Sequence, residues 1–165
     1  MILEWLNIEQ WIQFGTVAVA LLALLIKHQG MKNFIPVGMF ASLYSNIACY
    51  IGKYFNLWEF PARLFSSTIE DIPITVNIVL VPIIAMFWIR YAPLRLRGKI
   101  MWAVLWSAVF SAVEFFIERY TELLQYYQGY QFYHSFLFWF ISFFIWYGFH
   151  LWMNDGRRDF DSMFR

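Results

Sequence analysis

Residues 132–153 read FYHSFLFWFISFFIWYGFHLWM, and this stretch decides the fold class. It contains no Lys, Arg, Asp or Glu. As an α-helix it would extend about 33 Å, at 1.5 Å per residue, and the hydrocarbon core of a bilayer is about 30 Å thick. A membrane β-strand needs only about 10 residues and alternates apolar with polar side chains. The stretch therefore predicts a membrane-spanning helix.

Four further apolar stretches precede it, at residues 11–26, 34–52, 72–89 and 100–117. Only 14% of the 165 residues are charged and 61% are apolar, whereas a soluble domain carries roughly 25% charged residues. The sequence predicts an all-α, polytopic membrane bundle of five transmembrane helices that forms one domain over residues 1–165. Pro82 predicts a kink in the third span, because its ring displaces the carbonyl group four residues earlier. Between the second and third spans, aromatic residues such as Trp58 predict a segment in the interface plane.

The distribution of Lys and Arg predicts the orientation, since positively charged loops stay in the cytoplasm. With five spans, one face carries the N-terminus and the second and fourth loops, with three basic residues: Lys53, Arg63 and Arg119. The other face carries nine: Lys27, Lys32, Arg90, Arg95, Arg97, Lys99, Arg157, Arg158 and Arg165. We therefore expect the N-terminus outside and the C-terminus in the cytoplasm.

Several classes of function are disfavoured by composition. The net charge of +1 and the absence of a basic patch argue against a nucleic-acid partner. The single cysteine, Cys49, excludes an intrachain disulfide and a cysteine-based zinc site. The sequence contains no phosphate-binding loop and no nucleophile elbow. We expect no metal and no cofactor.

Glu114 is the one formally charged residue inside a predicted span, and such a residue marks a candidate functional site because its burial costs free energy. Ser107, Ser111, Glu114 and Glu118 follow at steps of four, three and four, which places them on one helical stripe. Glu114 and Glu118 are the candidate catalytic residues. Arg119 could instead neutralise either acid.

Other polar side chains fall in the outer half of the predicted bundle. A side-chain amide in lipid needs a partner, so we expect one outward-opening polar pocket. Its candidate residues are Asn46, Asp71, Asn77, Glu114, Tyr133 and His134. Small residues on the second span predict a seam for close helix packing. The seam residues are Gly38, Ser42, Ser45, Cys49 and Gly52.

Roughly 85 residues from the third span onward resemble a family of small, uncharacterised five-helix membrane proteins of spore-forming Firmicutes. The similar positions are Asp71, Val81-Pro82 with Met86, Glu114 followed by Tyr120, and Tyr133-His134-Ser135-Phe136. Phe115-Phe116 departs from the proline expected after Glu114. The resemblance implies five spans and a bacterial plasma or spore membrane, and it implies no reaction.

Three functions are compatible with these features. The first is a non-enzymatic membrane protein that binds a lipid or a partner membrane protein, with membrane lipids, other membrane proteins or further copies of the chain as partners. The second is an intramembrane enzyme that modifies a lipid or isoprenoid, with Glu114 as general acid or base. The third is a small proton-coupled transporter, although the odd number of spans disfavours it.

Overall fold

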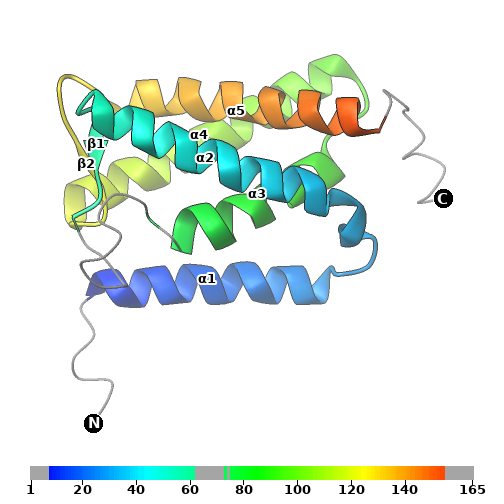
Figure 1. Cartoon of the computed structure of the whole chain (residues 1–165), viewed down its shortest axis with the longest axis horizontal. Coiled ribbons are helices and arrows are strands. Elements are labelled where there is room, and N and C mark those ends of the chain that lie inside the picture. The colour runs from blue at the N-terminus through cyan, green and yellow to red at the C-terminus, as the bar shows by residue number, and fades with distance from the viewer. Residues whose placement is uncertain (1–7, 62–72, 74, 155–165) are drawn as a thin grey trace, which may run out of the picture.

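The computed structural model describes residues 8–61, 73 and 75–154. Within them, five α-helices run back and forth along the molecule (Figure 1). They are α1 (Ile8–Ile26), α2 (Ile35–Tyr54), α3 (Val81–Tyr91), α4 (Leu96–Tyr120) and α5 (Phe132–Met153). A 3-10 turn, η2 (Met31–Phe34), precedes α2, and a π-helix, η3 (Thr75–Leu80), leads into α3. Two short strands, β1 (Trp58–Glu59) and β2 (Gln125–Tyr126), complete the described elements.

The predicted all-α class is confirmed, and four helices are long and apolar enough to cross a bilayer. They cover Ile8–Ile26, Met31–Tyr54, Leu96–Tyr120 and Phe132–Met153. The predicted third span corresponds to the shorter apolar helix Thr75–Tyr91. At 1.5 Å per residue this helix extends about 26 Å, slightly less than a bilayer core of about 30 Å. The structure thus indicates a membrane protein.

Pro82 marks a change of helix type. The residues before it form the π-helix η3, and Pro82 stands in the first turn of α3. Proline has no N–H to donate and is tolerated at the start of an α-helix, where that donor has no intrahelical partner. The π-helix carries Asn77, which is buried.

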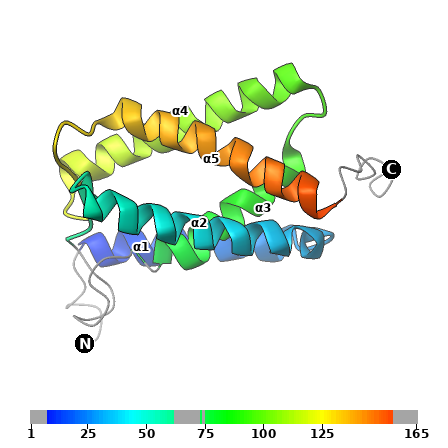
Figure 2. The same cartoon turned by 45° about the horizontal axis from the view of Figure 1, so that its top comes forward.

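The helices pack as two pairs, with α4 against α5 and α2 against α3 (Figure 2). Trp88 of α3 stacks on Phe143 of α5 between the pairs, with ring centroids 4.8 Å apart. Polar side chains such as Ser107 and Ser142 are buried, whereas large aliphatic side chains such as Leu105 face outward. Small and polar residues between helices, with apolar residues outside, are typical of packing in lipid.

Helix α1 lies along η3 and α3, apart from α4 and α5 (Figure 1). Ala20 is its one buried residue. Polar bonds attach the helix near both ends. Thr75 Oγ1 donates to Gln13 Oε1 at 3.0 Å, and Arg90 Nη1 donates to the carbonyl oxygen of Lys27 at 2.9 Å.

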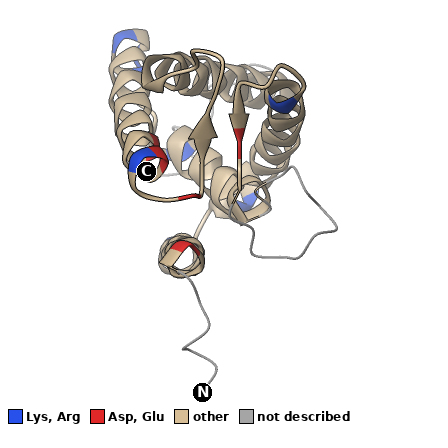
Figure 3. Cartoon of the chain, turned by 90° about the vertical axis from the view of Figure 1, so that its left-hand side faces the viewer, with Lys and Arg blue, Asp and Glu red and all other residues tan. Residues whose placement is uncertain are grey.

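Strands β1 and β2 form an antiparallel ribbon across one end of the bundle, which we call the ribbon end (Figure 3). Trp58 pairs with Tyr126 and Glu59 with Gln125. The ribbon joins the connection after α2 to the connection after α4. The described part of the segment predicted to lie in the interface plane is thus hydrogen-bonded to a second loop.

Gly52 makes room for the Trp58 ring at the ribbon end. A Cβ atom on Gly52 would lie 2.1 Å from Cζ2 of Trp58, so the ring would have to move. We expect Gly52→Ala to lower the free energy of unfolding by about 1–3 kcal/mol, the usual cost of overpacking. The measurement is SDS-induced unfolding in mild detergent, followed by circular dichroism.

Gly148→Ala is the matched control, because a Cβ atom there would meet nothing within 4 Å. This variant should be unchanged or more stable by up to about 1 kcal/mol, from the helix propensity of alanine. If both variants had the same free energy of unfolding, the close packing of the Trp58 ring on Gly52 would be contradicted.

Candidate functional site

The Glu114 carboxylate accepts three hydrogen bonds at the interface between α4 and α5. Tyr126 Oη donates to Oε2 at 3.0 Å, and the Ser135 hydroxyl donates to the same oxygen. Trp139 Nε1 donates to Oε1 at 2.8 Å. Ser135 and Trp139 are four residues apart and therefore share one face of α5, and Tyr126 comes from β2. Three donors thus converge on one acid.

These donors stabilise a charge that is expensive at this depth. An ionised carboxylate removed from water loses its hydration, and hydrogen bonds to the charged form compensate part of that loss. In the part of the chain that the structure describes, Glu114 forms no ion pair with a Lys, Arg or His. The donors that surround it are neutral, so an ionised Glu114 has no counter-charge among these residues.

Glu114 opens into a cavity of about 100 Å³ beneath the ribbon. The volume is sufficient for several water molecules, since about 10–15 Å³ of such space holds one. Its wall combines polar groups near Glu114 with aromatic rings from α2, α5 and both strands. The lining residues are Tyr44, Ser45, Ala48, Cys49, Trp58, Phe60, Pro73, Val76, Asn77, Val81, Glu114, Leu124, Tyr126, Tyr130, Ser135, Phe138, Trp139 and Trp146.

Asn77 contributes a second acceptor to this cavity. Its side chain is only 3% exposed. Nδ2 donates to Asn46 Oδ1 at 3.3 Å and to Cys49 Sγ at 3.2 Å. No described residue donates to Asn77 Oδ1. The Asn77 Oδ1 atom is not among the fully buried atoms without a partner, and as part of the cavity wall it is available to accept a hydrogen bond from a ligand.

Two tyrosines from the loop before α5 keep their protons at this site. Burial raises the pKa of Tyr126 above its ordinary value, and the negative charge of Glu114 raises it further. Burial and the same charge raise the pKa of Tyr130. Both hydroxyl groups therefore remain protonated at physiological pH, and Tyr126 remains a donor to Glu114.

The structure brings together three of the predicted pocket residues. Asn77 and Glu114 line the cavity, and Asn46 is bonded to Asn77 from outside it. Asp71 lies outside the described residues.

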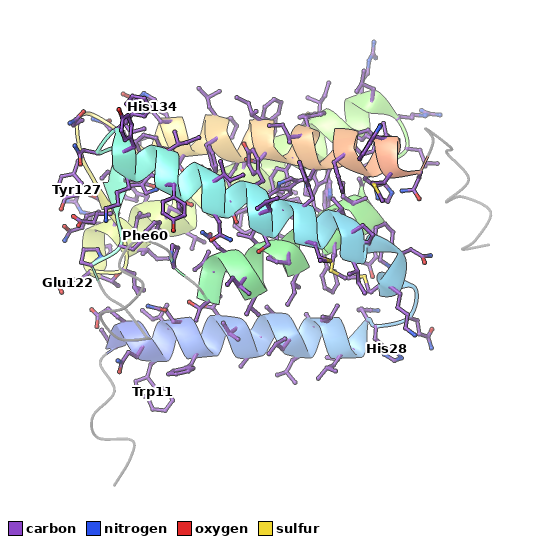
Figure 4. All side chains as sticks on the ribbon, viewed as in Figure 1. Trp11, His28, Phe60, Glu122, Tyr127 and His134 are labelled. Atoms are coloured by element: carbon purple, nitrogen blue, oxygen red, sulfur yellow. The ribbon has the colours of Figure 1, made fainter. Side chains whose placement is uncertain are left out.

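Tyr133, His134 and Glu118 do not line the cavity. His134 caps α5 by accepting the backbone N–H of Gln131 at 3.1 Å. Its ring stacks on Tyr130, which does line the cavity, with centroids 5.3 Å apart. Figure 4 shows His134, Tyr127 and Phe60 together at the ribbon end, with His28 at the other end.

The predicted seam on α2 faces inward at four of its five positions. Gly38, Ser45, Cys49 and Gly52 are buried and Ser42 is partly buried. A Cβ atom on Gly38 would lie 3.1 Å from the Met86 side chain, so α2 and α3 approach closely there. Gly52 packs against Trp58, and Cys49 lines the cavity. The seam therefore contacts both α3 and the site.

Sequence reasoning missed the principal donors to Glu114. Trp139 was recoverable in principle, since it lies four residues after Ser135 on one helical face. Tyr126 was not, because it belongs to a loop whose place over Glu114 depends on pairing with β1. Trp58 depends on the same pairing. No periodic pattern encodes a contact between two loops.

A second, apolar cavity of about 710 Å³ lies between α1, α3 and α4. Its lining includes Trp11 and Val19 of α1, Phe87 of α3 and Trp106 of α4. It is well suited to hydrocarbon chains, and it has no acid in its lining. Of these two cavities, the Glu114 cavity is the one with a carboxylate in its wall.

No group of three or more His, Cys, Asp or Glu residues able to hold a metal ion occurs among residues 8–61, 73 and 75–154. In comparisons with protein-family models, curated proteins and solved structures, nothing matches this chain. The function must therefore be argued from the site itself.

Tyr126→Phe tests the hydrogen-bond network around Glu114. The variant keeps the ring and removes one donor to a buried carboxylate, a bond worth about 1.5–3 kcal/mol. We expect a corresponding loss in the free energy of unfolding in mild detergent. Tyr127→Phe is the control, because its hydroxyl bonds to the nearby Gln125 at the exposed surface. Tyr127→Phe should change the free energy of unfolding by less than about 0.5 kcal/mol. A similar loss in both variants would show that the hydrogen bond from Tyr126 to Glu114 does not stabilise the fold.

Proposed function

We propose that this chain is a multi-pass membrane protein that binds a lipid or a small membrane-borne ligand in the Glu114 cavity without transforming it. The observation that carries the proposal is an acid without a counter-charge among the described residues, set in the wall of a small cavity at the ribbon end. A buried ionisable group in a membrane is costly and marks a functional site.

The hydrogen bonds of Glu114 favour binding over catalysis. A general acid or base must bring a carboxylate oxygen to the substrate within hydrogen-bond reach. Here Oε2 already accepts from Tyr126 and Ser135, and Oε1 accepts from Trp139. These three donors hold the carboxylate in one orientation and leave about one of its four lone-pair sites for a ligand. A fixed acceptor suits recognition better.

We place the protein in a bacterial plasma membrane with five spans, counting η3 with α3 as the third. Lys27, Arg90 and Arg95 lie at the end of the bundle opposite the ribbon. The positive-inside rule then puts that end in the cytoplasm and the ribbon end outside. Membrane lipids, or a partner membrane protein, would reach the cavity from the outer leaflet.

Labelling of single cysteines tests this orientation. In a Cys49→Ala background, Gln128→Cys reports the loop after α4 and Leu94→Cys reports the loop before it; both native residues are exposed. We expect a membrane-impermeant maleimide to label Gln128→Cys in intact cells. Leu94→Cys should react only after permeabilisation. The reverse pattern would overturn the orientation.

Glu114→Gln tests the binding function. The substitution keeps the shape of the side chain and removes its charge. We expect a ligand that co-purifies with the wild type in lipid nanodiscs, detected by native mass spectrometry, to be lost from this variant. Glu118→Gln is the matched control on the next turn of α4, outside the cavity, and should retain the ligand.

Two other results of this experiment would change the proposal. Retention of the ligand by Glu114→Gln would refute binding in this cavity. If an added lipid changed in mass and the change required Glu114, the protein would be an enzyme and the proposal of binding without reaction would be wrong.

Proton-coupled transport is the second candidate, favoured by the buried face of α4. That face carries Lys99, Ser107 and Ser111 as well as Glu114. Within the described chain, the hydroxyl groups of Ser107 and Ser111 are buried without a hydrogen-bond partner. Such groups are suited to hold water along the helix. A Glu114-dependent proton flux into vesicles would support this candidate over simple binding.

A further inference from the structure

We propose that the Glu114 cavity recognises a primary ammonium group, carried either by a lipid headgroup or by a free alkylamine. This inference rests on the proposed binding function and names the chemistry of its ligand. It is drawn from charge, from the arrangement of acceptors, from the aromatic wall and from the size of the cavity.

An ionised Glu114 calls for a cation. Its three donors are a phenol, a hydroxyl and an indole, which are all neutral. An ion pair with a ligand would supply the missing positive charge, and Coulomb attraction is strong where water is scarce. An ionised carboxylate also has about four lone-pair sites, so three donors leave room for a fourth.

The acceptors suit an ammonium group in number and place. An ammonium group carries three N–H donors and no acceptor. Glu114 approaches the cavity from α4, and Asn77 approaches it from η3. Asn77 Oδ1 has no donor among the described residues and is part of a side chain that is 97% buried. Because both residues line the same small cavity, an ammonium group bound there has two kinds of acceptor available to its N–H donors.

Aromatic rings complete the wall. Trp58 and Tyr130 lie with ring centroids 4.9 Å apart, and Tyr126 and Tyr130 with centroids 5.0 Å apart. All three residues line the cavity. The faces of tryptophan and tyrosine rings attract organic cations, with a larger effect where the cation is desolvated. The faces of these rings repel an anion, and so does an ionised Glu114. An anionic ligand is therefore disfavoured in this cavity.

The size of the cavity restricts the ligand further. At about 100 Å³ it is smaller than a cavity of about 150 Å³ that accepts benzene. A primary ammonium group with one or two methylene groups therefore matches the cavity more closely than a bulkier trimethylammonium group does. Glu114 lies six residues from the end of α4, about 9 Å along the helix, near the headgroup layer of the membrane.

The experiment measures the thermal stability of the full chain in nanodiscs of phosphatidylglycerol with added ethylammonium chloride. We expect ethylammonium to raise Tm in a saturable manner. Neutral 1-propanol and tetramethylammonium should have no saturable effect. Glu114→Gln should weaken the ethylammonium affinity by about 30-fold or more, as expected when one partner of a buried charge pair is removed. Glu118→Gln should bind as the wild type does.

Asn77→Leu keeps the inference testable if Glu114→Gln fails to fold. It should weaken ethylammonium binding while leaving the three hydrogen bonds to Glu114 in place. Nanodiscs of phosphatidylethanolamine distinguish the two sources of the amine. A raised Tm and a lost response to ethylammonium there identify a lipid headgroup as the ligand. An unchanged Tm with a retained response identifies a free amine.

Two results would overturn the inference. One is a saturable response to 1-propanol equal to that of ethylammonium. The other is wild-type ethylammonium affinity in both Glu114→Gln and Asn77→Leu. If a ligand still co-purified in a Glu114-dependent way while ethylammonium had no effect, the binding function would stand and the ammonium assignment would fall.

Discussion

The burial of one carboxylate governs the arrangement at the ribbon end of this protein. In a medium of low polarity a charged side chain needs either hydrogen bonds, a counter-charge, or both. Glu114 receives the first from Tyr126, Ser135 and Trp139. Because these residues come from β2 and α5, satisfying one acid fixes the loop after α4 and the start of α5 together.

The ribbon extends this constraint to the other half of the bundle. Tyr126 pairs with Trp58 of β1, and the Trp58 ring packs on Gly52 at the end of α2. Asn77 then contacts Cys49 and Asn46 on the same helix. A continuous set of contacts thus leads from α5 through the ribbon to α2 and η3, and the small cavity lies at its centre. Contacts from several elements therefore hold the side chains of this site in place.

The remainder of the bundle follows the packing rules of a lipid environment. Since lipid is as apolar as leucine, helices associate through small residues and polar contacts. Gly38 permits the close approach of α2 and α3, and Ser142 donates to Tyr44 across α5 and α2. Helix α1 is held by Gln13 and by the carbonyl oxygen of Lys27 near its ends. Its small residues Gly15, Thr16, Ala20 and Ala23 line the apolar cavity between α1, α3 and α4.

The sequence by itself determined the helices. Long apolar runs without charges specify membrane helices through composition alone, so the stretch 132–153 matches α5 residue for residue. It also singled out Glu114 and Asn77, because a polar group in an apolar run is visible without a structure. The third apolar run was predicted less completely. The π-helix η3 ends just before Pro82 and α3 begins there, and hydropathy does not distinguish the two helix types.

Only the tertiary structure decided which polar groups meet. His134 and Ser135 are neighbours in the sequence, so hydropathy places them at the same depth in the membrane. The orientation of α5 about its axis directs Ser135 toward Glu114, whereas His134 caps the start of the helix. Glu118 differs from Glu114 by a single turn of α4 and lies outside the cavity. The pairing of β1 with β2 brings together Trp58 and Tyr126, which are 68 residues apart in the chain. Hydropathy records how deep a residue lies, whereas helix rotation and loop pairing depend on contacts between segments that are distant in the chain.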